Sequence, residues 1–438
     1  MIKFAKSLAV ILALPLVLAG CKINSINYFP PTFAHIRVVN VLGTTTPINI
    51  AANGATVWSG LNFEAMTGYQ DFENVTTKIS ISLAGSSTPL LEQTIYPTGN
   101  QSSTLVIYGT VSAPLIGTMV DVDQPPPSGQ FQLNVFNAAP IANGTSLGNY
   151  PLDFYFTPPG QAIDSISPKF TNIYYTNGNI FGQFQAGQYQ LRLTVAGTKI
   201  IIYDSGPLTF SEQTATDLVI YSRGSEILAN VLLNDSDGAG KQVIANSLLS
   251  RLKVVNGAFQ TGPVNQLLNG TAGVSNLAFG AASLYSIVSA GPGTVTFEAV
   301  SAPGAPIASL AATFVAGADQ SIFVAGFAGA TSAVPLNDIN LPPANNAASV
   351  RIVNASPDSA SLDFYVNDAL LVKGVATYQQ SAYLQVVNGT YTLTFKDSGT
   401  GATVLTLSNV VLSSQQTFSV YAFGSEAALT GLVTPDTP

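Results

Sequence analysis

The chain has 438 residues, and its 15 basic and 23 acidic side chains give a net charge of −8, with charged residues making up only 9% of the total. Such an acidic chain repels nucleic acid, and so low a density of titratable groups argues against an enzyme. One cysteine and one histidine exclude internal disulfides and a zinc site, so no metal and no cofactor is expected, and the length predicts several domains.

The N-terminal segment has the pattern of an export signal. Lys3 and Lys6 precede an uncharged run from Ser7 to Leu18, which is too short to cross a membrane as a helix. The tetrapeptide that follows, LAGC, resembles the lipobox of bacterial lipoproteins, in which the signal is cut before the cysteine and the thiol is diacylated. The alternative is an ordinary secretory signal with an incidental cysteine.

The lipobox resemblance implies an anchor. Cleavage would fall between Gly20 and Cys21, which makes residues 1–20 the signal peptide and Cys21 the lipidation site. Acyl chains on Cys21 would hold the protein at a membrane, with residues 21–33 as a tether. Lys22 stands where many inner-membrane lipoproteins carry Asp, so the resemblance favours the outer membrane, with a periplasmic or surface-exposed orientation left open.

Four copies of one motif fill the rest of the chain, and each opens with an apolar run that ends in asparagine. The anchoring residues Asn40, Asn137, Asn256 and Asn354 are 97, 119 and 98 residues apart. Strand-like alternation and frequent turn residues follow in every copy, with about seven strands per copy. We therefore predict an all-β chain of four tandem immunoglobulin-like β-sandwiches. Their predicted bounds are 34–124, 129–238, 249–341 and 348–434.

The segments between the copies are rich in proline and glycine. They contain Pro125-Pro126-Pro127, Gly238-Ala239-Gly240 and Pro342-Pro343. Proline-rich joints are stiff and extended. We therefore expect neighbouring sandwiches to be spaced along a rod and not packed tightly together.

The fourth copy carries a family resemblance. Its segments VRIVNASPD (350–358) and LDFYV (362–366) resemble the opening signature of the domain of unknown function 4397, which occurs repeatedly in bacterial exported proteins. Copy two retains part of this signature, whereas copies one and three carry Asn49 and Asn265 in place of the aspartate and are assigned by spacing. The resemblance implies a β-sandwich in the cell envelope and brings no established activity or functional residues.

A polar pair recurs with a spacing of twelve residues. It consists of Arg37 with Asn49, Lys253 with Asn265 and Arg351 with Asp363. If the first two strands of a copy form an antiparallel hairpin, each pair lies directly across the ladder and fixes its register. The hypothesis fails if Arg351 and Asp363 lie on different sheets.

The other chemical candidates are few. His35 is a lone histidine without a nucleophile motif, so we interpret it as structural. The segment 234–238, NDSDG, resembles part of a calcium loop but lacks the full pattern and the distal glutamate, so we interpret it as a solvated turn.

A carboxylate and an aromatic ring share a strand face in two copies. The residues are Asp153 with Tyr155 and Asp363 with Tyr365. This combination can stack on a sugar and hydrogen-bond to it, although outward strand residues often have no ligand.

Two functions of different classes remain. The first is a lipid-anchored cell-envelope protein with a non-enzymatic structural or protein-interaction role. The alternative is a carbohydrate-binding surface lipoprotein or adhesin that acts through exposed tyrosines at 155 and 365. The expected partners are the membrane, through Cys21, and an envelope or extracellular protein or glycan, but not nucleic acid.

Overall fold

The computed structural model describes residues 32–120, 125–139, 141–142, 147–148, 151–223, 229–235, 242–339, 341–343 and 346–436. Within these ranges the chain is all-β, and the only helical element is the 3-10 turn η1 (Glu426–Ala428). The strands form paired sheets that repeat four times along the chain. The predicted all-β fold of serial β-sandwiches is confirmed. We name them sandwich 1 (33–120), sandwich 2 (130–245), sandwich 3 (249–338) and sandwich 4 (347–435).

Sandwich 1 sets the pattern with two four-stranded sheets, in the orders β4-β1-β7-β8 and β3-β2-β5-β6. Strands β1 and β7 run parallel at the centre of the first sheet. Each such sandwich therefore has eight strands, one more than the immunoglobulin count we predicted. The strands are β1 (Phe33–Asn40), β2 (Ile48–Ala52), β3 (Ala55–Leu61), β4 (Gln70–Glu73), β5 (Thr77–Leu83), β6 (Pro89–Ile95), β7 (Ser102–Thr110) and β8 (Ala113–Val120).

Sandwiches 3 and 4 repeat this topology strand for strand. Sandwich 3 contains β20 (Leu249–Phe259), β21 (Val264–Leu268), β22 (Thr271–Ala272), β23 (Ser286–Ser289), β24 (Gly291–Ala299), β25 (Pro306–Phe314), β26 (Asp319–Phe327) and β27 (Ala330–Asp338). Sandwich 4 contains β28 (Ala347–Ala355), β29 (Ser361–Val366), β30 (Ala369–Ala376), β31 (Leu384–Val387), β32 (Gly389–Asp397), β33 (Thr403–Leu412), β34 (Thr417–Phe423) and β35 (Thr430–Pro435).

Sandwich 2 extends the pattern with a five-stranded sheet, β14-β9-β17-β18-β19, packed on β13-β12-β15-β16. A short hairpin, β10 (Ile141–Ala142) with β11 (Leu147–Gly148), lies in its first connection. The other strands are β9 (Gln130–Asn137), β12 (Leu152–Thr157), β13 (Phe170–Ile173), β14 (Ile180–Gln185), β15 (Gly187–Val195), β16 (Ile201–Phe210), β17 (Ala215–Ser222), β18 (Ala229–Asp235) and β19 (Gln242–Ala245).

The central strands are buried on both faces. In β1, Ile36 and Val38 point into the core of sandwich 1, whereas Val39 belongs to a second apolar cluster shared with sandwich 2. Strands β17, β28 and β34 are buried along almost their whole length. A strand that is covered on both sides has a continuous apolar run instead of alternation. This is why the repeated motifs are apolar at successive positions.

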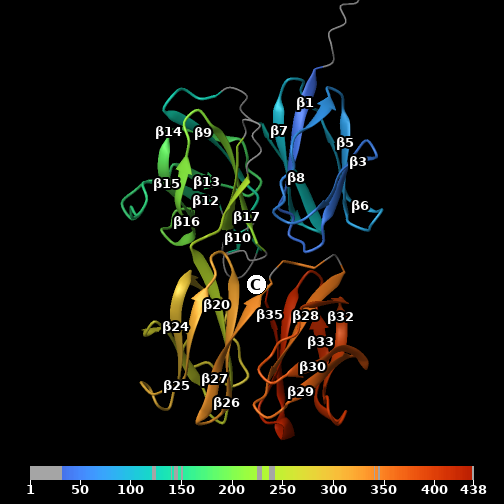
Figure 1. Cartoon of the computed structure of the whole chain (residues 1–438), viewed down its shortest axis with the longest axis vertical. Coiled ribbons are helices and arrows are strands. Elements are labelled where there is room, and N and C mark those ends of the chain that lie inside the picture. Colours follow the sequence, from blue (N-terminus) through green and yellow to red (C-terminus); the bar gives the residue numbers. More distant parts are fainter. Residues whose placement is uncertain are drawn as a thin grey trace, which may run out of the picture.

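The sandwiches are packed two by two, and the expectation of a spaced rod is wrong. Figure 1 shows sandwich 1 (blue) beside sandwich 2 (green) and sandwich 3 (yellow) beside sandwich 4 (orange to red), with one pair stacked on the other. Between the pairs, Ser112 donates to the Gln415 side chain over 2.6 Å and the Leu248 amide donates to the Asp204 carbonyl over 2.6 Å. The apolar outer faces of the central strands favour side-by-side packing, which stiff linkers do not prevent.

The predicted first hairpin is also wrong. Arg351 lies on β28 and Asp363 on β29, and these strands belong to different sheets. The reason is the anchoring asparagine. The buried Asn354 side chain donates to the Ser359 and Val375 carbonyls over 2.9 and 3.1 Å and accepts the Ser356 amide over 3.2 Å, which holds the chain as it crosses between sheets. Asn40, Asn137 and Asn256 make equivalent bonds in the other sandwiches.

Candidate functional site

Two buried ion pairs join sandwich 3 to sandwich 4. Lys253 of β20 contacts Asp436, which follows β35, and Arg351 of β28 contacts Asp338 at the end of β27. All four side chains are at most 2% exposed. Each sandwich therefore supplies one cation and one carboxylate to its partner.

The network has an internal two-fold relationship. Every member in sandwich 3 has its counterpart 98 positions later in sandwich 4: Lys253 and Arg351, Tyr285 and Tyr383, Ser321 and Ser419, Asp338 and Asp436. The Tyr285 and Ser321 hydroxyls donate to Asp338, and the Tyr383 and Ser419 hydroxyls donate to Asp436. Two sandwiches that present the same surface to each other form an isologous interface, as in a symmetric dimer.

The charges in this interface stabilise one another. Burial alone would raise the pKa of Asp436, but Lys253 and Arg351 outweigh that effect and hold its pKa below its usual value. Burial and the neighbouring Asp338 carboxylate raise the pKa of Tyr285 well above its usual value. Tyr285 therefore stays a neutral donor, and Asp436 stays an ionised acceptor.

Sandwiches 1 and 2 use a variant of the same arrangement. Arg37 occupies the position of Lys253 and donates to Asp217 of sandwich 2 over 3.0 Å, with both side chains at most 1% exposed. The corresponding position in sandwich 2 is Asn134, which donates to Asp217 over 3.2 Å. Asp217 lies on the central strand β17, opposite Asn134 in the ladder. The acid of this pair therefore comes from a different strand than Asp338 or Asp436.

Apolar side chains surround both sets of charges. The first interface contains Val39, Val106 and Tyr108 from sandwich 1 with Phe136 and Val219 from sandwich 2. The second interface contains Val255, Phe323, Ala325 and Leu336 from sandwich 3 with Val353, Ala355, Tyr421 and Phe423 from sandwich 4. Water is excluded there, and low polarity strengthens the ion pairs.

The carboxylates of the predicted ligand face support the backbone. Asp363 accepts the Gly374 amide over 2.8 Å, and Asp153 accepts the Asn172 amide over 3.1 Å. Asn49 and Asn265 accept the equivalent amides of Gly60 and Asn276 in the other two copies. All four amide donors have positive φ, between 54° and 72°. An Asp or Asn side chain at this position therefore holds a left-handed residue in the neighbouring edge strand or, in sandwich 3, just after it, which explains why the two residue types alternate among the copies.

The two tyrosines of that face do not form a free platform. Tyr155 is only 2% exposed, which corrects the expectation of an exposed ring. The Lys199 ammonium lies 4.6 Å from the Tyr155 ring centroid and donates to its hydroxyl over 3.1 Å. Tyr365 is half-buried, with the Lys396 ammonium 4.4 Å from its ring centroid. A lysine ammonium thus lies over one face of each ring.

The other residues predicted from the sequence form no catalytic or metal site within the described part of the chain. Gly20 and Cys21 lie outside the described residues, as does most of the segment 234–238. His35 forms an exposed pair with Asp71, with 2.7 Å between Nδ1 and Oδ1. Within the described ranges, no helix has the length and apolar character needed to span a bilayer. Those same ranges hold no group of three His, Cys, Asp or Glu side chains arranged for a metal ion.

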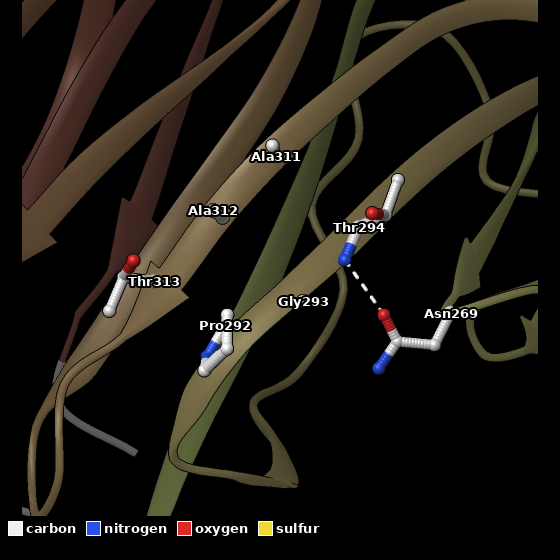
Figure 2. A pocket seen from close by; sticks show the side chains of 7 residues that line it. All are labelled: Asn269, Pro292, Gly293, Thr294, Ala311, Ala312 and Thr313. Atoms are coloured by element: carbon white, nitrogen blue, oxygen red, sulfur yellow. Dashed lines mark hydrogen bonds between the residues drawn. The ribbon is translucent and has the colours of Figure 1, made fainter.

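Two surface grooves among the described residues are further candidate sites. The first, of about 350 Å³, lies on the outer sheet of sandwich 3 over Gly293 and Ala312 (Figure 2). The Asn269 side chain at its edge already accepts the Thr294 amide over 2.8 Å, shown as the dashed line in Figure 2. The second groove, of about 320 Å³, lies in sandwich 1 between β6 and β8, and Tyr96 lines it.

The polar pairs predicted with a spacing of twelve residues include the cations Arg37, Lys253 and Arg351 but assign them the wrong partners. The acids that these cations contact, Asp217, Asp338 and Asp436, were not predicted. A usable signal was present, because Tyr285, Asp338 and Lys253 each recur 98 positions later with like chemistry. Recurrence of polar residues that lie far apart within one copy indicates a shared contact, whereas spacing within one hairpin does not.

Comparison with known proteins identifies the repeat. The family model described as "Domain of unknown function (DUF4397)" matches residues 34–144, 250–358 and 348–438. No curated protein matches the chain.

Solved structures that match have low similarity. A family 41 carbohydrate-binding module from streptococcal virulence factors, described for alpha-glucan recognition, is 11% identical, with 42% of this chain and 93% of that chain covered and a TM-score of 0.15. A family 26 module of Eubacterium rectale Amy13K in complex with maltoheptaose is 10% identical, with coverage of 43% and 92% and a TM-score of 0.15. The Bacillus anthracis TIE protein is 9% identical, with coverage of 90% and 67% and a TM-score of 0.16. These TM-scores are too low to carry an argument about function.

Proposed function

The chain belongs to the DUF4397 family, and from that premise we propose that it is a lipid-anchored protein of the bacterial cell envelope with a non-enzymatic structural or protein-interaction role. In this proposal, acyl chains on Cys21 hold the mature chain at the outer membrane. The four sandwiches then act as one rigid body that presents its loops and sheet edges to a partner.

The non-enzymatic role is supported by the buried charged side chains, which pair with one another between domains. Lys253, Arg351, Asp338 and Asp436 are at most 2% exposed and are paired with one another. Their charges join domains and are not turned toward a cleft. Buried ion pairs of this kind fix the relative orientation of the parts they join, which suits a scaffold.

The anchor is tested by metabolic labelling with an alkyne fatty acid, followed by fractionation of cells that produce the full chain or its Cys21→Ala variant. We expect the natural chain to carry label and to sediment with membranes, and the variant to be unlabelled and released by washing. The His35→Ala variant is the matched control and should behave like the natural chain. Equal labelling and equal membrane association of the natural chain and Cys21→Ala would contradict the anchor.

The rigid body is tested separately by small-angle X-ray scattering of the Cys21→Ala chain. A compact chain of this size has a radius of gyration of about 22 Å, and the two-by-two arrangement should lie close to that value. A rod of four spaced sandwiches would give a much larger radius, which would contradict the scaffold.

A further inference from the structure

The groove of sandwich 1 lies where the two sheets of the sandwich are open at one edge. It runs between β6 of one sheet and β8 of the other and has a volume of about 320 Å³, which is within the range of small-ligand sites. In sandwich 3 the corresponding edge is bridged, because Thr331 of β27 donates to the Ile307 carbonyl of β25.

The residues that line this groove are uncharged; those at its floor are apolar and those at its rim are polar. Its floor is apolar, with Ile36 and Leu105 at most 3% exposed. Its rim carries the amides of Gln93 and Gln101 and the hydroxyls of Thr98 and Thr118. None of the residues that line it is charged. The nearest acid along β6, Glu92, pairs with Lys78 over 2.7 Å.

An exposed aromatic ring stands at the same rim. Tyr96 is 77% exposed and follows the last residue of β6. An aromatic face held beside amide and hydroxyl groups offers apolar contact to the C–H face of a pyranose and hydrogen bonds to its hydroxyls. An anionic ligand finds no cation in this groove, so the chemistry favours an uncharged one.

From this placement we infer that the groove of sandwich 1 binds a neutral oligosaccharide, with a sugar ring stacked on Tyr96 and its hydroxyls bonded to Gln93 and Gln101. The site differs from the Asp–Tyr strand faces of sandwiches 2 and 4, whose rings each have a lysine ammonium over one face. The inference does not depend on the proposed lipid anchor at Cys21.

The test is calorimetric titration of the detergent-extracted full chain with hexasaccharides of glucose, mannose and xylose, and with hexagalacturonate as the anionic comparison. We expect at least one neutral hexasaccharide to bind and hexagalacturonate not to bind. Tyr96→Ala should weaken that binding about tenfold or more, and Tyr96→Phe should keep it, because the ring and not the hydroxyl makes the stacking contact.

Tyr174→Ala is the matched control, since Tyr174 is 49% exposed on sandwich 2 and does not line the groove. It should bind like the natural chain, and both alanine variants should have unchanged thermal melting curves because both rings are exposed. The inference is overturned if no neutral hexasaccharide binds, if only hexagalacturonate binds, or if Tyr96→Ala and Tyr174→Ala bind equally well. None of these outcomes affects the labelling test of Cys21.

Discussion

Lys253 and Asp436 are separated by 183 residues along the chain and meet in a buried contact between sandwiches 3 and 4. The pair is repeated in reverse by Arg351 and Asp338, so the interface is held by one cation from each side. Neither sandwich can move relative to the other without separating both charge pairs in an apolar setting. The two charge pairs therefore join sandwiches 3 and 4 in one relative orientation.

Removing one member of the pair should be costly. Lys253→Met leaves the Asp436 carboxylate buried with only part of its partners, and we expect the free energy of unfolding to fall by about 3–5 kcal/mol. Urea denaturation at pH 7 measures the change. The double variant Lys253→Met with Asp436→Leu should recover most of the loss, because it leaves no uncompensated charge. A double variant less stable than the single one would refute this account.

The first interface should show strong coupling between Arg37 and Asp217. A double-mutant cycle with Arg37→Gln and Asp217→Asn should give an interaction energy of about 2 kcal/mol, since both side chains are at most 1% exposed. The comparison cycle uses Lys78 and Glu92, which are 55% and 45% exposed, and should give less than about 1 kcal/mol. Equal values for the two cycles would show that burial of the Arg37 pair adds nothing.

Stability should decline in acid because of Asp436. Its pKa in the folded protein is below the usual value, so its contribution is present above the unfolded pKa of about 3.9 and is lost as the pH falls through the lower folded pKa. Urea midpoints measured from pH 7 down to pH 2 should therefore drop below about pH 4. Asp436→Asn should flatten that drop, and an unchanged slope in the variant would assign the acid sensitivity to other carboxylates.

Asp363 should tolerate asparagine but not alanine. The side-chain oxygen that accepts the Gly374 amide is retained in Asp363→Asn, and copies one and three already carry asparagine at this position. Asp363→Ala removes the acceptor and should cost about 1 kcal/mol. Thermal unfolding distinguishes the two variants, and equal losses would mean that the charge of Asp363 matters and not its acceptor oxygen.

The repeat, the all-β class and the sandwich architecture follow from the sequence, because alternation and the asparagine-terminated motif are local signals. The side-by-side packing of the sandwiches is harder to predict from the sequence. The continuous apolar run through Val38 and Val39 was the available indication of burial on both faces, but a single buried strand gives the same pattern.

The buried ion pairs were predictable only in part, because their partners lie far apart in the sequence. Arg351 and Asp363 share a spacing that suits a hairpin, yet Asn354 redirects the chain into the other sheet, so the true partner of Arg351 lies in another domain. Side chains at Asp153 and Tyr155 have the chemistry of a ligand site, but their use depends on Asn172 and Lys199, which reach them only in the folded chain. Long-range partners of this kind leave no local signal.

Because each sandwich covers the apolar face of its neighbour, the smallest unit that can be duplicated or deleted without exposing that face is two repeats and not one. A chain that lost only sandwich 4 would leave Val255, Phe323 and the Lys253 ammonium of sandwich 3 uncovered. Changes in repeat number should therefore occur in steps of two within this architecture.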